Sequence, residues 1–383
     1  MSSTQLPFGL TEDALEAAMS EEDPESLAAA SRMRARYGPD LAAAALTQAS
    51  LRRQARAKFG DAAAELFFTR AGLEQATRPE VADHHASRFL EAGVRRVIDL
   101  GCGIGSDSMA FLRAGLDVVA MDVDPATAAV AKANLVGRAE VICADASEVA
   151  GELITSGVAV FCDPDRRNEH GRVWRVEDFE PRWAIVMRLL DGGRTAGVKL
   201  GPALPHSLIP EAVESEWITH RGETVEVGLW SGPGTSPGRR SALIMPNARL
   251  SVTPAPPLRV RDLGRYLYEP AGAVIRAGAV AVLGAELAAG LLDPHVAYLT
   301  SDQLCSTPFA TAFEVHQRLP FHLKALRTWV REAQIGVLEI KKRGIDVDPA
   351  ALRRRLRLAG PNSATLVISP TPRGVVAAVV ERA

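Results

Sequence analysis

The sequence predicts an α/β protein, in which a doubly wound, mostly parallel sheet is flanked by an N-terminal helical region and a C-terminal α+β domain. Three observations lead to this fold class. Short apolar runs alternate with helix-length segments from about residue 94 onward, as in βαβ units. The run Val94–Leu100 leads into three alternating glycines, which suit a tight turn between a strand and a helix. Four runs end in an acidic residue, as at the ligand-binding edge of open α/β sheets.

Length and composition indicate a chain of several domains. Its 383 residues suggest two or three domains, and a net charge of −2 gives it no overall basic character. We expect an N-terminal helical region over 1–75, a central domain over 76–250 and a C-terminal domain over 258–383. The Pro-rich segment 252–257 is predicted to be a linker.

The N-terminal region is predicted to be helical between residues 10 and 78, with breaks at Pro24 and Gly38-Pro39. Residues 31–60 carry a net charge of +6, and residues 320–383 carry +7. Such asymmetry favours a polyanion partner, although ordinary solvated helix faces explain it equally well. The basic side chains that end the first of these segments are Arg52, Arg53, Arg56 and Lys58.

The central domain opens on a glycine-rich turn. Asp99 ends the first apolar run, and Gly101, Gly103 and Gly105 follow it. This spacing differs from the G-x-G-x-x-G spacing of dinucleotide sites. A helix is predicted over 106–114, so that its free N–H groups face the turn.

Three further apolar runs end in Asp122, Asp145 and Asp163. Asp122 lies 23 residues after Asp99, close to the roughly 20-residue spacing of an acid that binds ribose hydroxyls. An acid at a strand end also serves as a helix N-cap, and Asp124, directly before a proline, fits that role. Four ordered acids in one β-α-β series favour a ligand site.

These strand ends resemble the motifs of class I S-adenosylmethionine (SAM) methyltransferases, which have a Rossmann-like sheet and a D-x-G-x-G-x-G turn. The resemblance implies SAM as the cofactor, with Asp122 on the ribose hydroxyls. It also implies that Asp145 contacts the adenine amino group and that Ala146 offers a backbone N–H. The cofactor-binding residues expected are Asp99, Gly101, Gly103, Gly105, Asp122, Asp145 and Ala146.

The run after the fourth strand, Asp163-Pro164-Asp165-Arg166, stands where this superfamily places the methyl acceptor. Enzymes that methylate base amino groups carry [D/N/S]-P-P-[Y/F/W] there. Asp163 and Pro164 match, whereas Asp165 and Arg166 replace the second proline and the aromatic residue. We expect Asp163 and Asp165 to orient or deprotonate the acceptor, and Arg166 to hold the nucleotide. An internal salt-bridge turn is the alternative interpretation.

A helix is predicted over 76–90, directly before the first strand. Several methyltransferases of this superfamily, trimethylguanosine synthase among them, have such a helix over the cofactor. By that resemblance His84, His85 and Arg88 would lie near the site, and plain surface positions are the alternative for the two histidines.

The remaining elements continue the alternation and end in an antiparallel pair. Lys199, near the end of the fifth strand, is expected to reach the same sheet edge. Strands are predicted near 94–100, 116–122, 140–144, 157–163, 194–200, 215–220, 224–230 and 240–246. Helices are predicted near 106–114, 125–136, 146–153, 178–190 and 206–213.

The C-terminal domain is predicted to begin with Leu267–Pro270 and Ala-rich helices to about residue 292. Strands over 335–342, 364–369 and 374–380 and a helix over 349–358, opened by Asp348, are expected to follow. The helix carries Arg353, Arg354, Arg355 and Arg357, and with the turn Lys341-Lys342-Arg343-Gly344 it suggests an RNA-binding surface. The order of motifs resembles bacterial methyltransferases whose C-terminal region is called THUMP-like, by analogy with THUMP domains that bind tRNA.

Taken with the resemblance, the motifs predict a SAM-dependent methyltransferase acting on a base nitrogen in tRNA or rRNA. A small-molecule or protein methyltransferase and a non-catalytic SAM- and RNA-binding protein stay open as alternatives. Four scattered cysteines suggest neither a metal site nor disulfides. Without a signal-peptide pattern or an apolar run of ~18 residues, we expect a cytoplasmic protein with no membrane partner. The oligomeric state is not predicted.

Overall fold

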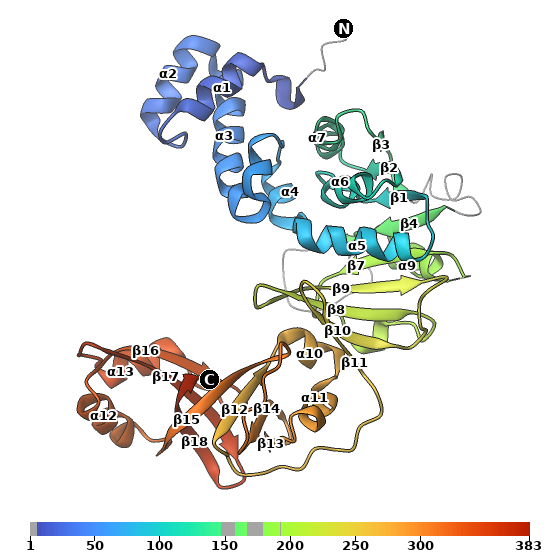
Figure 1. Cartoon of the computed structure of the whole chain (residues 1–383). Coiled ribbons are helices and arrows are strands. Elements are labelled where there is room, and N and C mark those ends of the chain that lie inside the picture. The colour runs from blue at the N-terminus through green and yellow to red at the C-terminus, as the bar shows by residue number, and fades with distance from the viewer. Residues whose placement is uncertain (1–5, 147–157, 167–178, 192) are drawn as a thin grey trace. The chain divides into compact units, whose positions relative to one another are not determined.

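The computed structural model describes residues 6–146, 158–166, 179–191 and 193–383, and it describes residues 165, 166 and 180 through their backbone alone. The predicted helix over 146–153 therefore lies outside the described residues, apart from its first position. The chain forms two compact units, shown in Figure 1. Unit 1 comprises Met1–Glu214 and Val227–Gly238, and unit 2 comprises Ser215–Glu226 and Arg239–Ala383.

The N-terminal part of unit 1 is helical, as expected. Thr11 and Ser26 begin two of its helices, because each side chain accepts a hydrogen bond from the backbone N–H three residues later. The helices are α1 (Glu12–Ser20), α2 (Leu27–Tyr37), α3 (Pro39–Phe59) and α4 (Arg70–Gln75), with 3-10 turns η1 (Pro7–Gly9) and η2 (Gly60–Ala64).

These helices join one continuous apolar core with the sheet of unit 1. The segment Leu66–Phe68, which follows η2, is buried in that core. Asn134 fastens it there, since its side-chain oxygen accepts from the Phe67 N–H at 2.8 Å and its amide donates to the Phe67 carbonyl at 3.0 Å. The same amide donates to the Ile104 carbonyl at 2.9 Å, within the glycine-rich turn.

The sheet of unit 1 has the predicted mainly parallel arrangement. Its strands lie in the order β9-β7-β4-β1-β2-β3, all parallel except the antiparallel pair of β7 and β9. Helix α5 lies along this sheet in Figure 1, and its Phe89 packs edge-on against Phe161 and Trp230. The strands are β1 (Arg96–Leu100), β2 (Asp117–Asp122), β3 (Glu140–Cys143), β4 (Ala159–Cys162), β7 (Ala196–Leu200) and β9 (Glu223–Ser231). The helices are α5 (Pro79–Glu91), α6 (Ser106–Arg113), α7 (Pro125–Leu135) and α9 (Trp183–Leu190).

The predicted helix over 206–213 is wrong. Only the 3-10 turn η4 (His206–Leu208) forms there, followed by extended backbone at Ile209. Pro210 explains the difference, because a proline ring disfavours helical backbone in the preceding residue and offers no N–H to continue the turn.

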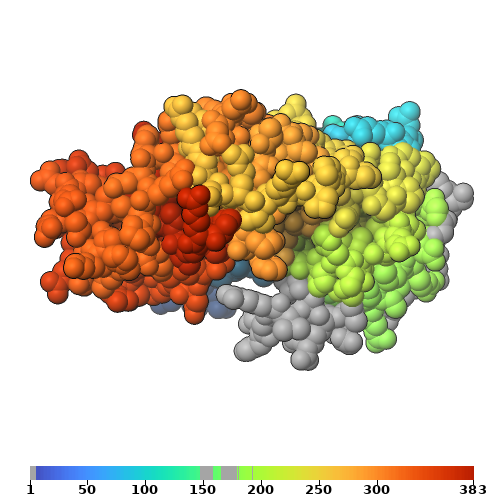
Figure 2. Space-filling view, turned by 90° about the horizontal axis from the view of Figure 1, so that it is seen from below, coloured from blue at the N-terminus to red at the C-terminus, as the bar shows by residue number. Residues whose placement is uncertain are grey.

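Unit 2 contains most of β8 (Glu214–His220), which pairs in parallel with β10 (Arg240–Ile244), while β11 (Ala248–Ser251) pairs antiparallel with β10. A second sheet has the order β13-β14-β12-β15-β18-β17-β16. Its C-terminal strand reaches the surface between other segments of the unit, as Figure 2 shows. The strands are β12 (Tyr266–Pro270), β13 (Gly290–Asp293), β14 (Val296–Ser301), β15 (Ala310–Pro320), β16 (Ile335–Lys342), β17 (Asn362–Thr371) and β18 (Gly374–Arg382). The helices are α10 (Gly272–Ala277), α11 (Val280–Glu286), α12 (Leu323–Glu332) and α13 (Pro349–Leu356).

The predicted strand over 335–342 is confirmed, and Asp348 caps α13 by accepting from the Ala350 N–H at 2.9 Å. The Ala-rich helices end at Glu286 rather than near residue 292, because Gly290–Asp293 pairs as a strand with β14. Among the helices that the structure describes, none is long and apolar enough to cross a membrane.

Candidate functional site

The glycine-rich turn after β1 adopts a backbone that requires glycine. Gly101 and Gly105 have φ of 75° and 87°, in the left-handed region. The N–H groups of Gly101 and Cys102 both donate to the Met121 carbonyl at 2.9 Å, so the turn folds over the end of β2. A Cβ on Gly103 would meet nothing within 4 Å, so one side of this turn is open.

Asp122, at the end of β2, fixes the turn from the neighbouring strand. One carboxylate oxygen accepts from the Gly103 N–H at 3.0 Å, and the other accepts from the Asp124 N–H at 3.0 Å. Asp124 in turn caps α7 by accepting from the Thr127 N–H at 2.9 Å, which confirms its interpretation as a helix cap. Asp122 thus lies at the glycine-rich turn, as the sequence predicts.

Asp99 lies beneath the turn with 1% of its surface exposed. One carboxyl oxygen accepts from the Ser108 hydroxyl at 2.5 Å, and the other has no partner among the described residues. Burial, together with the nearby Asp107 carboxylate, raises the pKa of Asp99 to about 8. A buried oxygen without a hydrogen-bond partner is unusual, and a bound ligand that carries a hydrogen-bond donor would satisfy it.

Asp163 and Pro164 follow β4 directly beside the glycine-rich turn. The Asp163 N–H donates to the Leu100 carbonyl at 3.1 Å, and a Cβ on Gly101 would come within 2.9 Å of the Asp163 carbonyl oxygen. Pro164 is buried, while the Asp163 side chain keeps 31% of its surface exposed. The backbone of Asp165 and Arg166 forms β5, paired with β6 (Phe179–Glu180), and the side chains of these two residues lie outside the description.

Asp145 and Ala146 follow β3, the next strand beyond β2. Asp145 is half-buried and Ala146 is 9% exposed. The strand register sets the Asp122 end of β2 beside Cys143, two positions before Asp145. All the predicted cofactor-binding residues therefore lie at or just after the carboxyl ends of β1, β2 and β3, which are neighbours in the sheet.

The open turn, the unpaired Asp99 oxygen and the half-buried Asp122 and Asp145 fit a group with cationic and hydroxyl functions, as SAM has. Metal coordination finds no such support, because no group of three or more His, Cys, Asp or Glu side chains gathers within the described ranges.

A buried polar network under the site escaped sequence reasoning. The Asp107 carboxylate on α6 accepts from the Thr77 hydroxyl at 2.6 Å and contacts His85 Nδ1 at 2.8 Å. Lys199 on β7 donates to the Thr77 oxygen at 2.9 Å and forms an ion pair with Asp163. Burial opposes ionisation of Asp107, but the His85 contact, the Lys199 charge and the Thr77 hydrogen bond together keep the pKa of Asp107 below its usual range.

Arg88 and His85, expected near the site from the lead-in helix, are buried on the inner face of α5. Arg88 pairs with Glu214 at 2.8 Å and lies over the Trp230 ring at 4.8 Å. The His85 ring packs 5.0 Å from the Phe161 ring, measured between centroids. Arg88 therefore has a structural setting, whereas His85 connects through Asp107 to the network.

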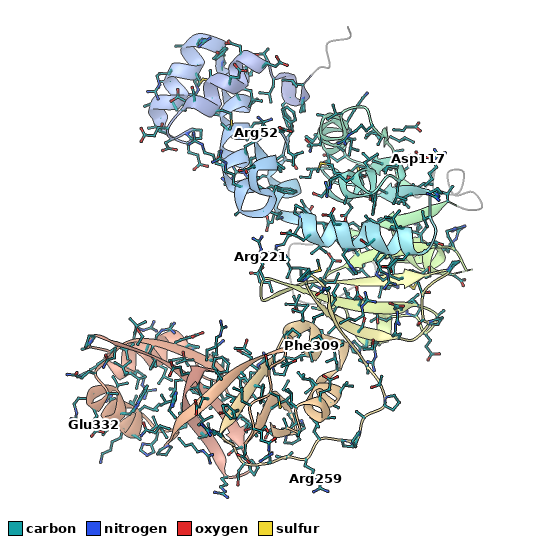
Figure 3. All side chains as sticks on the ribbon, in the orientation of Figure 1. Arg52, Asp117, Arg221, Arg259, Phe309 and Glu332 are labelled. Atoms are coloured by element: carbon teal, nitrogen blue, oxygen red, sulfur yellow. The ribbon has the colours of Figure 1, made fainter. Side chains whose placement is uncertain are left out.

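The cations of the two basic segments differ in the groups that they contact. In the N-terminal region, Arg52 is 8% exposed and donates to the Leu66 carbonyl at 2.9 Å (Figure 3). Arg53 donates to the Glu21 and Glu22 carbonyls, and Lys58 donates to the Glu74 and Ala76 carbonyls at 2.8 and 3.0 Å. These cations bind the protein's own backbone.

In unit 2, Lys341 and Arg343 of the predicted basic turn both pair with Glu269, at 2.9 and 3.7 Å. The two helices α12 and α13 instead present exposed cations on one side, and the Arg327 guanidinium joins them by donating to the Arg355 carbonyl at 2.9 Å. We call these two helices the basic helix pair. Its exposed cations are Lys324, Arg327, Arg331, Arg354, Arg355 and Arg357.

Family models match three segments of the chain. One described as "Methyltransferase domain" matches residues 97–168, one described as "THUMP domain-like" matches residues 310–382, and a domain of unknown function matches residues 12–55. The first covers the glycine-rich turn and Asp163, and the second covers the basic helix pair.

Whole-chain comparisons agree with these matches. A protein described as an "Uncharacterized S-adenosylmethionine-dependent methyltransferase" occurs in two strains of Mycobacterium tuberculosis, and it is 34% identical over 299 residues, 76% of this chain and 80% of the relative. The crystal structure of a "putative methyltransferase" from Porphyromonas gingivalis W83 shares the fold, with a TM-score of 0.77, 22% identity and coverage of 97% of this chain and 98% of the other.

Proposed function

The chain belongs to the SAM-dependent methyltransferases, with a class I catalytic fold and a THUMP-like C-terminal domain, and we propose that it methylates a base nitrogen in tRNA or rRNA. SAM is its cofactor. We place the reaction in the cytoplasm. The acceptor position of Asp163, beside the cofactor turn, carries the proposal.

We assign cofactor binding to the edge formed by β1, β2 and β3. The turn Gly101–Gly105 would cradle the methionine part, and its open side at Gly103 supports this assignment. Asp122 would accept hydrogen bonds from the ribose hydroxyls, while Asp145 and the Ala146 N–H would hold the adenine. The unpaired oxygen of Asp99 would face the cationic end of the cofactor.

We assign the acceptor to Asp163-Pro164-Asp165-Arg166. Bound SAM supplies a methyl group on a sulfonium, which is already a good leaving group. The acceptor nitrogen must then present its lone pair and lose a proton once the new N–C bond forms. Asp163, with 31% of its side chain exposed at the turn, is suited to accept the N–H hydrogen bond of that nitrogen and later its proton.

RNA is favoured over a small acceptor by the basic helix pair. Five exposed cations on α12 and α13, and Arg357 directly after α13, lie within the segment matched by the THUMP-like model. Lys and Arg that neutralise phosphates give salt-dependent affinity for nucleic acid. Arg52, Arg53 and Lys58 of the N-terminal region add nothing to this argument, because they bind backbone carbonyls of their own unit.

The test is transfer of labelled methyl groups from SAM to total RNA from cells that lack the protein, compared with RNA from normal cells. We expect incorporation into the deficient RNA alone, and digestion to nucleosides would identify the methylated nitrogen. Asp163→Ala should abolish transfer while retaining SAM binding. Asp117→Ala, at the exposed start of β2 (Figure 3), is the matched control and should behave as wild type.

No incorporation into either RNA, with SAM binding confirmed in the same preparation, would refute an RNA acceptor. Wild-type turnover by Asp163→Ala would refute the acceptor assignment. Charge reversal at Arg354 and Arg355 should weaken RNA binding and leave SAM affinity unchanged, and an unaltered RNA affinity would remove the basic helix pair from the proposal.

A further inference from the structure

The polar network beneath Asp163 has a fixed direction. The Thr77 hydroxyl has one proton, and its 2.6 Å contact commits that proton to the Asp107 carboxylate. Thr77 can therefore only accept from Lys199, whose nitrogen lies 2.9 Å away. The Lys199 ammonium donates to Thr77 and to Asp163 at once, with 12% of its side chain exposed.

The groups that face Asp163 leave Lys199 as the dominant charge among the described side chains. On β1, the Asp99 carboxyl has a pKa raised to about 8 by burial, so it is mostly neutral at pH 7. On β4, burial raises the pKa of the Cys162 thiol well above its usual value. The ammonium on β7 contacts the Asp163 carboxylate, and a contacting cation favours the ionised form of a carboxyl group.

The far end of the network is built to hold the ammonium still. Asp107 is 6% exposed and His85 is 0% exposed, so neither can move into solvent without opening the core. Each of the two Asp107 oxygens has its own partner, His85 Nδ1 or the Thr77 hydroxyl. A satisfied buried network of this kind rigidifies the groups at its end.

We propose that Lys199 is a positioning residue, which fixes the direction and the negative charge of the Asp163 carboxylate. Thr77, Asp107 and His85 hold Lys199 in that position. The inference rests on the acceptor role assigned to Asp163 under the proposed function. It implies that Asp163 meets the acceptor N–H as a carboxylate already aimed at the turn, rather than as a freely rotating group.

The test reads the Asp163 carboxyl directly. The full chain is labelled with carboxyl-¹³C aspartate, and the Asp163 signal is assigned by its loss in Asp163→Asn. In Lys199→Met, we expect the Asp163 titration midpoint to rise by about 1–3 pH units, the usual effect of removing a contacting opposite charge. Lys199→Arg keeps a cation and should leave the midpoint near the wild-type value. Identical midpoints in wild type and Lys199→Met would overturn the proposal.

Thr77→Val is the second variant, and it serves if Lys199→Met does not fold. It keeps the ammonium but removes its hydrogen bond to Thr77, so the midpoint should rise by less than in Lys199→Met. A wild-type midpoint in Thr77→Val would overturn the role of the network. SAM affinity should stay within about twofold in these variants, because none of the altered groups is assigned to the cofactor.

The pH dependence of methyl transfer supplies the functional readout. The acid limb of the kcat/KM profile should move to higher pH in Lys199→Met, with activity recovered at the alkaline end, whereas a purely structural loss would lower the profile at every pH. If the wild type methylates no RNA, the proposed function fails, and the carboxyl titration still decides on Lys199.

Discussion

The ion pair between Arg88 and Glu214 should be worth far more than a surface pair, and α5 allows the comparison because it supplies one partner to a buried pair and one to an exposed pair. The Arg88 side chain is 8% exposed and Glu214 is fully buried, with 2.8 Å between Nη1 and Oε1. Glu214 also accepts from the Ser236 N–H at 2.9 Å. Arg88→Met would leave the Glu214 carboxylate buried without this counter-charge, which costs about 3–5 kcal/mol.

The matched control is the exposed pair between Asp83 on α5 and Arg113 at the end of α6. Its side chains are 49% and 56% exposed, at 2.6 Å. Arg113→Met should cost about 0–1 kcal/mol, the usual range for a surface pair. Urea unfolding of the full chain, followed by near-UV circular dichroism, compares the two variants through their midpoints.

A third variant separates charge from packing. Glu214→Gln in the Arg88→Met background neutralises the buried carboxylate and should recover part of the lost stability. If Arg88→Met unfolds at the same urea concentration as Arg113→Met, the buried pair does not hold α5, and the reasoning fails. If the double variant is no more stable than Arg88→Met, the loss comes from packing on Trp230 rather than from an uncompensated charge.

Three further predictions concern the cofactor turn. Burial raises the pKa of Asp99 from 3.8 to about 8, so the native chain keeps a proton that the unfolded chain releases. The free energy of unfolding should therefore fall as the pH rises from about 4 to 8. Asp99→Asn should flatten this pH dependence in urea unfolding, and parallel curves for the two proteins would contradict the prediction. Asp122→Ala should raise the SAM dissociation constant at least about tenfold in equilibrium dialysis, as the loss of charged hydrogen bonds predicts, and an unchanged constant would sink the ribose role. Gly101→Ala should lose more thermal stability than Gly93→Ala. Both glycines have φ of 75°, but only a Cβ on Gly101 would meet a backbone oxygen, 2.9 Å away on Asp163. Equal losses of thermal stability would show that this close approach has no cost.

The fold was predictable from sequence where local pattern and backbone chemistry agree. The strand over 335–342 is a short apolar run with turn residues after it, and Asp348 before a proline marks a helix start. The glycines at 101 and 105 indicated positive φ, because few other residues adopt it. The helix predicted over 206–213 does not form, because Pro210 disfavours helical backbone at Ile209.

The site was predictable only in part, because side-chain pairing over long sequence separations leaves no periodic signal. Thr77 and Asp107 are 30 positions apart, and Arg88 and Glu214 are 126 apart. Lys199 was expected to reach the sheet edge, but its ion pair with Asp163 depends on β7 lying beside β4. The basic segments show the same limit, since net charge along the sequence does not reveal which cations bind backbone carbonyls.

The close approach of Gly101 to the Asp163 carbonyl has a consequence for how such enzymes change. At this point the main chain of the glycine-rich turn faces the main chain of Asp163, and a Cβ on Gly101 would come within 2.9 Å of the Asp163 carbonyl oxygen. Neither can be transplanted or lengthened alone without displacing the other. Changes at this edge of the sheet are therefore expected in the side chains around the contact, while the two main-chain segments have to change together.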